Sequence, residues 1–405
     1  MTFDTLKSRQ GADKSCQSID KNAALELNQG WEIKKLGEVI EIINGRNQSQ
    51  VISENGEYPI YGSAGNLMGY ANDYLCEAGT TIIGRKGNIS NPIFIEEKFW
   101  NVDTAFGLFP KKDYDPKFIN YLCHTIDFKS RNRGTTIPSL VKSDLLTIDV
   151  PFVSSLPEQQ RIVAILDRCF AAIDKAKAHA EQNLNNAKEL FESYLRGVFD
   201  NGNWEKKKLQ DVATSFGRGK SKHRPRNWEG LYGGNYPFIQ TGEVRNANKF
   251  ITNYTQTYNE VGLAQSKLWK KGTICITIAA NIAETAILDF DACIPDSIIG
   301  FEVDNKKADL NFAYYLLQYF KAELQKLGKG SAQDNINLGT FENQYFPFPP
   351  LNEQQTIVRQ LDALRAETQK LEAVYRQKIA DLDELKKSIL QKAFAGELDT
   401  EKAVL

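Results

Sequence analysis

The sequence lacks several features that would assign it to a common class of protein. No apolar run approaches 18 residues, and the polar N-terminus has no apolar segment of the kind a signal peptide needs. The six cysteines are scattered without a C-x-x-C pair, and there are only three histidines. We therefore expect no membrane span, no disulfide framework and no metal site, and we expect reduced thiols and a cytoplasmic location.

The chain also lacks an excess of either charge. Its 50 Lys and Arg residues nearly balance its 51 Asp and Glu residues, which gives a net charge of −1. This balance excludes neither nucleic acid nor other partners, because a local basic patch and not the average charge binds phosphate. A length of 405 residues predicts two or three domains. Composition alone leaves the function open.

What the sequence does contain is a long internal repeat. SSLPEQQRIVAILD and PPLNEQQTIVRQLD place Gln159 and Gln354 at equivalent positions, 195 residues apart. WEIKKLGEV at Trp31 returns as WEKKKLQDV at Trp204, and ELFESYLRGVF returns as ELKKSILQKAF. GTTIIGRKGNI likewise returns as GTICITIAANI in the same order along the chain. Such ordered landmarks indicate an internal duplication.

Each copy consists of a β-rich segment followed by a long helical one. The first part mixes short β-rich runs with Gly, Pro and Asn turns, which is typical of a compact α+β globule. The second part has apolar residues at alternating steps of four and three, as in Ile162, Leu166, Cys169 and Ile173, which predicts a coiled-coil stripe. The second globule begins directly after one helix and ends directly before the other, so the helices are expected to run antiparallel.

The predicted fold is therefore α+β, with two pseudo-symmetric globules separated by a long antiparallel two-helix coiled coil. The expected divisions are an N-terminal extension (1–30), a first globule (31–155), a first helix (156–200), a second globule (201–350), a second helix (351–398) and a C-terminal tail (399–405).

The repeated motifs resemble those of the specificity subunit of a type I restriction–modification enzyme. The residues that carry the resemblance are Trp31-Glu32 with Leu36, Trp204-Glu205 with Leu209, and the LPEQQ and PPLNEQQ helix starts. The resemblance implies that each globule is a target-recognition domain reading half of a bipartite DNA sequence. It also implies that the helices set the spacing between the half-sites and dock two methyltransferase (modification) subunits. Residues 1–30 have no counterpart in the other copy and lie outside the resemblance.

The resemblance further implies a chain without catalysis or cofactors of its own. S-adenosylmethionine would be used by the methyltransferase partner, and ATP and Mg by a restriction (nuclease–translocase) subunit that joins the complex. Fragments that suggest enzymes are incomplete: GRGKS lacks the first glycine of a phosphate-binding loop, because Thr214 stands there. The alternative function is a coiled-coil scaffold with two protein- or glycan-binding globules and no role on DNA.

Two-part DNA reading needs phosphate anchors and base-edge readers. The predicted phosphate anchors are Arg218, Lys220, Lys222, Arg224 and Arg226, together with Lys129, Arg131 and Arg133. The predicted reading loops contain Thr135, Thr136, Lys329, Gln333 and Asn335, and further loop candidates are Arg46, Asn47, Arg85, Lys86, Gln240, Thr241 and Arg245. The alternative for all of them is a solvated loop or a turn held by capping side chains.

Partner docking needs apolar side chains that lie off the stripe between the two helices. The predicted docking positions are Val163, Phe170, Leu190, Leu195 and Phe199 in the first helix, and Val358, Val374 and Leu390 in the second. If they form exposed strips, they mark partner sites.

Overall fold

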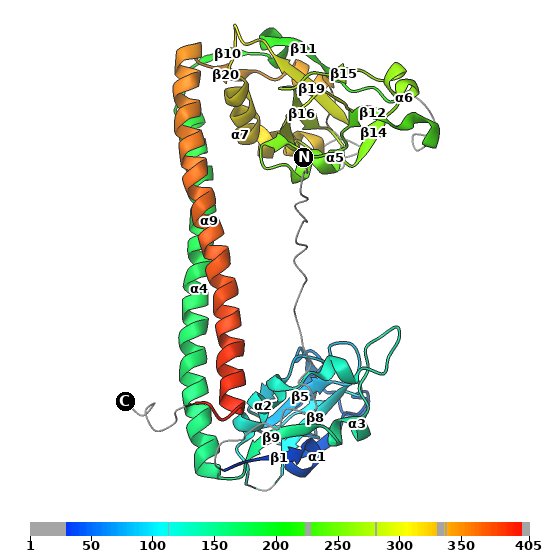
Figure 1. Cartoon of the computed structure of the whole chain (residues 1–405), viewed down its shortest axis with the longest axis vertical. Helices are drawn as coiled ribbons and strands as arrows, with labels where there is room; N and C mark the ends of the chain where they lie inside the picture. Colours follow the sequence, from blue (N-terminus) through cyan, green and yellow to red (C-terminus); the bar gives the residue numbers. More distant parts are fainter. Residues whose placement is uncertain are drawn as a thin grey trace, which may run out of the picture. The chain divides into compact units, whose positions relative to one another are not determined.

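The computed structural model describes residues 30–111, 113–222, 228–279, 282–329, 336 and 338–398. The chain divides into two compact units, Met1–Ala178 with Ile379–Leu405, and His179–Lys378. Each unit contains one globular domain and one end of each long helix (Figure 1). We call the globular parts domain 1 (31–155) and domain 2 (201–350). No helix among the described residues is long and apolar enough to cross a membrane.

Domain 1 is built around a four-stranded sheet with the order β2-β8-β5-β6, beside a three-stranded sheet β4-β3-β7 and the pair β1-β9. Its strands are β1 (Trp31–Lys35), β2 (Ile40–Asn44), β3 (Tyr58–Tyr61), β4 (Leu67–Ala71), β5 (Thr80–Gly84), β6 (Ile93–Ile95), β7 (Trp100–Asn101), β8 (Ala105–Pro110) and β9 (Asp149–Val153). Its helices are α1 (Leu36–Val39), α2 (Pro116–Thr125), the 3-10 turn η1 (Phe128–Arg131) and α3 (Lys142–Leu146).

Helix α2 covers β5 and β8 of this sheet (Figure 1). It begins where the Asp115 side chain accepts a hydrogen bond from the Phe118 amide at 2.9 Å, and Pro116 suits the first turn because its missing N–H needs no partner there. Strand β5 reads as a continuous buried run, TTIIG, since it is central in the sheet. This explains why β5 lacks the alternation of a half-exposed strand.

Domain 2 repeats this plan with additions. Its main sheet has the order β11-β19-β16-β17-β13, and a second sheet has the order β14-β12-β18-β15, beside the pair β10-β20. The strands are β10 (Glu205–Lys207), β11 (Ala213–Arg218), β12 (Tyr232–Phe238), β13 (Phe250–Ile251), β14 (Gln256–Tyr258), β15 (Leu268–Trp269), β16 (Ile274–Thr277), β17 (Thr285–Leu288), β18 (Ala292–Cys293), β19 (Ile298–Val303) and β20 (Phe346–Phe348). The helices are η2 (Leu209–Val212), η3 (Glu229–Leu231), α5 (Thr241–Asn246), α6 (Glu260–Ala264), α7 (Leu310–Lys329) and α8 (Leu338–Glu342).

Domain 2 has four further elements, η3, α5, β13 and α6, which have no counterpart among the described elements of domain 1. Strand β13 adds to the outer edge of the main sheet by pairing in parallel with β17. Its neighbour Lys249 lies 2.7 Å from a carboxylate oxygen of Asp362 on a long helix, and the Asn248 amide oxygen accepts from Arg365 and Gln369. The added segment therefore braces domain 2 against that helix.

The two long helices are α4 (Leu156–Asp200) and α9 (Leu351–Phe394). In the first unit, Lys177 pairs with Asp383 at 2.6 Å and Asp174 with Lys386 at 2.8 Å. In the second unit, the Tyr194 hydroxyl donates to Gln360 at 3.2 Å. In the first unit residue numbers rise along α4 as they fall along α9, so the helices are antiparallel there, as the sequence predicted. Figure 1 shows the paired ribbons within each unit.

The second helix is shorter than its predicted range of 351–398. Helix α9 ends at Phe394, and Gly396 adopts a φ of 75° two residues later. A glycine in this left-handed region is a common helix stop because other residues are strained there.

Candidate nucleic-acid interface

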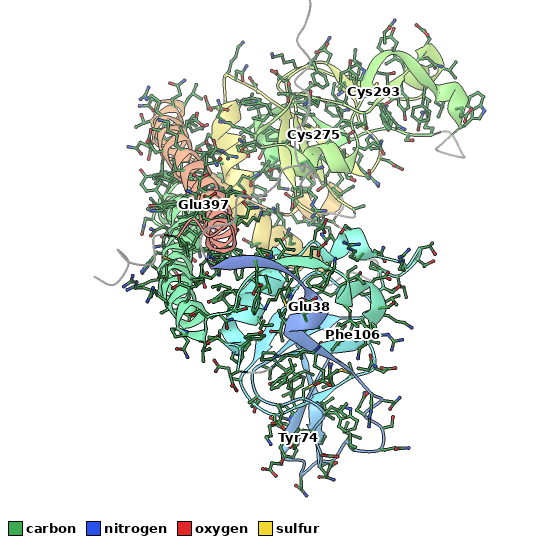
Figure 2. All side chains as sticks on the ribbon, turned by 60° about the horizontal axis from the view of Figure 1, so that its bottom comes forward. Glu38, Tyr74, Phe106, Cys275, Cys293 and Glu397 are labelled. Atoms are coloured by element: carbon green, nitrogen blue, oxygen red, sulfur yellow. The ribbon has the colours of Figure 1, made fainter. Side chains whose placement is uncertain are left out.

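The predicted DNA-contacting loops of domain 1 include segments that leave the main sheet at the same end of its strands. Strand β2 ends at Asn44, which pairs with Phe106, and β5 ends at Gly84, which pairs with Ala105 at the start of β8. Figure 2 labels Phe106 within this sheet. Because neighbouring antiparallel strands end and begin together, the segments after β2 and β5 emerge side by side. We call this the loop edge of domain 1.

Backbone hydrogen bonds tie these loops to one another. The Arg46 amide donates to the Asn101 carbonyl at 2.9 Å, and the Trp100 indole donates to the Arg46 carbonyl at 3.0 Å. Lys86 forms a β-bridge with Ser139, and the Leu140 amide donates to the Arg85 carbonyl at 2.9 Å. Segments 85–87 and 138–140, which are far apart in the sequence, therefore lie against each other.

The loop after η1 has its own internal supports. The Asp127 carboxylate accepts from the amides of Lys129 and Ser130, and the Asn132 side chain accepts from those of Gly134 and Ser139. A side chain at Gly134 would lie 1.8 Å from the Ile137 carbonyl oxygen, so only glycine fits. These contacts hold a compact loop whose polar side chains face solvent.

All nine site residues predicted in domain 1 are exposed. They are Arg46, Asn47, Arg85, Lys86, Lys129, Arg131, Arg133, Thr135 and Thr136, and Arg133 pairs with Asp144 at 2.8 Å. Asn47 accepts from the Ser49 amide at 2.8 Å, which is the local turn contact that the alternative interpretation expected. Contact with DNA stays a prediction for each of these positions.

Domain 2 has an equivalent loop edge. Strand β11 ends at Arg218, which pairs with Ile299 near the start of β19, and β16 ends beside it. The Arg218 guanidinium donates to the Asp296 carbonyl at 2.8 Å, and the Gly219 amide donates to the Ile298 carbonyl at 2.8 Å. A side chain at Gly219 would lie 2.3 Å from the Ile294 carbonyl oxygen, so glycine permits this close approach.

The basic loop after β11 follows directly from this anchor. Lys220 and Lys222 are exposed, whereas Ser221 between them is buried. Arg224, Arg226, Gln333 and Asn335 lie outside the described residues, and Lys329 is the last residue of α7. The Ile336 amide donates to the Ile278 carbonyl at 3.2 Å, which matches the Leu140–Arg85 contact of domain 1.

The other predicted residues of domain 2 lie at α5. Gln240 immediately precedes the helix, and its side-chain nitrogen donates to the Gln256 oxygen at 3.0 Å. Thr241 begins the helix and is half-buried, and Arg245 in its last turn is exposed. Gln240 and Thr241 line the same pocket as Ser221 of the basic loop. The structure thus brings Gln240 and Thr241 together with that loop. Gln256, which was not among the predicted residues, lines the same pocket.

The repeated EQQ motif joins each long helix to its domain. The fully buried Gln159 side chain donates to the Val153 carbonyl at 2.7 Å and accepts from the Asp115 amide at 2.8 Å. Gln354 makes the same two bonds, to the Pro349 carbonyl and from the Asp309 amide, both at 2.8 Å. The motif is therefore repeated because both domains fix the start of a helix in the same way.

A second repeated contact lies two turns further along each helix. Asp167 accepts from the Tyr121 hydroxyl, and Asp362 accepts from the Tyr315 hydroxyl. Burial and these hydrogen bonds raise the pKa of Tyr121 and the pKa of Tyr315. Both phenols therefore stay protonated as donors, and each domain is held to its helix at a second point.

The C-terminal end of each long helix packs against the domain of the other copy. In the first unit, Phe394 of α9 packs on Trp31 and Phe118, with ring centroids 6.1 and 5.1 Å away. In the second unit, Phe199 of α4 packs on Trp204 and Phe312 at 6.0 and 5.5 Å. Each domain thus holds the start of one long helix and the end of the other.

This packing corrects the predicted docking strip. Val163 and Phe170 are buried in the core of the first unit, and Leu195, Phe199 and Val358 in that of the second. The expectation that these five lie on an exposed strip is wrong, because at these positions the domains cover the helix faces outside the stripe between the helices. Leu190 is 51% and Val374 59% exposed, and Leu390 is half-buried against the first core. Docking stays a prediction at these three positions.

Among the described residues, no group of three His, Cys, Asp or Glu side chains is placed to hold a metal ion. The cysteines that the structure describes are free thiols, and burial raises the pKa of Cys123 to about 12. Cys275 and Cys293 lie within strands of domain 2 (Figure 2).

Two α+β domains with matching polar loop edges, each fastened to a long helix by the same motif, define a duplicated recognition protein. The family described as the type I restriction modification DNA specificity domain matches residues 28–185 and again 201–380. The chain therefore belongs to the family of type I restriction–modification DNA specificity subunits.

Curated relatives agree with this assignment, and solved structures share the fold. The MjaVIII specificity subunit of Methanocaldococcus jannaschii is 25% identical, with 92% of this chain and 94% of that protein covered. The EcoDI specificity subunit of Escherichia coli is 22% identical, with 93% and 90% covered. The fold is similar to that of a chain from a type I restriction–modification assembly (TM-score 0.76, 19% identity, 92% and 100% covered). It is also similar to the HsdS subunit of Thermoanaerobacter tengcongensis (TM-score 0.57, 19% identity, 92% and 98% covered).

Proposed function

We propose that each domain reads one half of a bipartite sequence in duplex DNA, while α4 and α9 set the distance between the half-sites. Two methyltransferase subunits dock on the helices, and restriction subunits join the full complex. The observation that carries this proposal is the loop edge, where exposed cations and polar side chains from separate segments meet in both copies. Family membership supports DNA as the partner and favours this function over the scaffold alternative.

The side chains of the loop edge suit two kinds of DNA contact, to phosphates and to base edges. Flexible exposed cations such as Lys86, Lys220 and Lys222 suit phosphate oxygens, because phosphate contacts position a protein without reading sequence. Amide and hydroxyl side chains held in fixed turns, such as Gln240 and Thr136, suit base edges. Duplication gives each half-site a reader built on the same plan.

Catalysis in this proposal belongs to the partners. The chain contributes no reacting group, and the methyltransferase subunits use S-adenosylmethionine. The restriction subunits use ATP and Mg. The chain acts in the cytoplasm, where host DNA lies.

The test is the salt dependence of DNA binding by the chain in complex with its methyltransferase subunits. Neutralised phosphates release counterions, so affinity for duplex DNA falls steeply as salt rises. Replacing Lys220 and Lys222 by Gln lowers the slope of log affinity against log salt by about 1 for each lysine. The matched control is Lys370→Gln, an exposed lysine on α9, which leaves the slope unchanged. Salt-insensitive binding to a protein or glycan, without duplex binding, would instead establish the scaffold.

A further inference from the structure

A pocket in domain 2 gathers polar side chains from four separate segments. It has a volume of about 260 Å³ and is lined by Ser221 of the basic loop, Gln240 before α5, Gln256 at the start of β14 and Ser297 before β19. Ser221 follows the Arg218–Gly219 anchor, so the pocket opens beside the predicted phosphate anchors. Phosphate anchors beside a fixed polar pocket are what base reading requires.

The two glutamines at this pocket hold each other in place. The Gln240 side-chain nitrogen donates to the Gln256 side-chain oxygen at 3.0 Å. The Gln240 backbone amide donates to Glu243 at 3.1 Å, and the other carboxylate oxygen of Glu243 accepts from the Thr255 hydroxyl. Glu243 therefore ties the turn that carries Gln240 to the residue before Gln256. It holds together the two backbone segments that carry the amide pair, which itself lies at the surface.

Such a pair has a defined set of remaining hydrogen-bonding groups. The Gln256 oxygen accepts one bond from Gln240 and has a second lone pair, and the Gln256 nitrogen keeps N–H donors, so Gln256 still offers a donor and an acceptor next to each other. This remains true if both amides are turned over, because each amide carries one oxygen and one nitrogen. A neighbouring donor and acceptor match the N7 and N6 groups of adenine in the major groove.

We propose that Gln256 reads an adenine in the half-site bound by domain 2, and that Gln240 is the residue that positions it. This rests on the proposed function and names the base and the side chain that reads it. The bound adenine accepts from an amide N–H at N7 and donates from N6 to an amide oxygen.

Domain 1 has different chemistry at the equivalent place. In domain 2, Phe238 of β12 pairs with Gln256 of β14 on one side and with Cys293 of β18 on the other. In domain 1, Ile60 of β3 has the same place in the sheet, because it pairs with Gly69 of β4 on one side and with Trp100 of β7 on the other. A glycine thus stands where domain 2 has Gln256. The adenine reader therefore belongs to one half-site and not to both.

The experiment measures binding of the chain with its methyltransferase subunits to duplexes in which each base pair of the wild-type target is varied in turn. Gln256→Leu removes both the donor and the acceptor, so preference for adenine at one base pair falls by about 5- to 150-fold. Gln256→Glu keeps acceptors but loses the donor to N7, so the same preference falls there too. Gln240→Leu weakens it because Gln256 is no longer oriented. The matched control is Gln210→Leu, an exposed glutamine in η2 at the far end of β11 from Arg218.

The inference predicts that all other base pairs, including the whole of the other half-site, keep their wild-type preference. Unchanged preference at every base pair in both Gln256 variants would overturn it. An equal loss over all base pairs would overturn it as well, since that is the behaviour of a phosphate contact or a supporting residue. If the wild-type complex itself showed no sequence preference, the proposed function would fail first, and the two failures are distinguishable.

Discussion

At the scale of single residues, the clearest result is the pair of buried glutamines. Gln159 and Gln354 each join two backbone groups, a carbonyl shortly before the long helix and the amide of an aspartate that precedes a second helix. The adjacent Gln160 and Gln355 are exposed. One glutamine of each EQQ motif therefore has a structural role that its neighbour does not share.

Replacing Gln159 by Leu is expected to lower the free energy of unfolding. The Asp115 amide and the Val153 carbonyl would lose their bonds to this side chain, and a buried backbone group left unpaired costs about 1–3 kcal/mol. Urea unfolding measures the change, with Gln160→Leu as the matched surface control. Equal stability of the two variants would contradict the role given to Gln159.

The sequence predicted the positions of these residues but not their bonds. The 195-residue offset marked Gln159 and Gln354 as equivalent, whereas their partners Asp115 and Asp309 are brought to them only by folding. For the predicted docking residues, the sequence predicted the wrong surroundings. Phe170 and Phe199 lie off the stripe between the helices and were therefore predicted to be exposed, but a pattern along the helices takes no account of the domains that cover them. The sequence did not predict Gln256 as a site residue, because only the folded chain brings its side chain to that of Gln240.

At the scale of elements, each long helix ends in the core of the domain that it does not follow. Phe394, only 3% exposed, closes the domain 1 core against Trp31, although more than 350 residues separate them in the sequence. Helix α9 is thus part of the core of domain 1 as well as a partner of α4. The apolar spacing predicted the stripe between the helices and the chain connectivity predicted that they run antiparallel, but neither contained information on where the helix ends would pack.

Replacing Phe394 by Ala is expected to destabilise the first unit selectively. Removing a buried phenyl ring costs about 3–5 kcal/mol. Hydrogen exchange should show lost protection in domain 1 strands and little change in domain 2 strands. Leu385→Ala, at a 47% exposed position of the same helix, is the control and should change stability by less than about 0.5 kcal/mol. Equal loss of protection in both domains would contradict this packing role.

At the scale of the whole molecule, duplication explains both the similarities and the differences between the copies. The main sheets share the order β2-β8-β5-β6 and β11-β19-β16-β17, and the loop edges lie at the same strand ends. The copies differ in β13, in α5 and at Gln256, which domain 2 alone carries. One plan with different loops suits two half-sites of different sequence.

Deleting one heptad from each long helix together is expected to shorten the spacer between the half-sites. Seven residues correspond to about 10 Å of helix, or about three base pairs of DNA. The half-site sequences should stay unchanged, because the loop edges are untouched. Methylation mapping measures the spacer, and an unchanged spacer would mean that the helices do not set it.

The most direct test of the whole account is to co-express the chain with the methyltransferase subunit of its system and map methylated bases across the host genome. We expect a split motif, with two defined half-sites around a spacer of fixed length and one modified base on each strand. A single undivided motif, or a stable complex that methylates without sequence preference, would contradict the claim that the two domains read separate halves of one target.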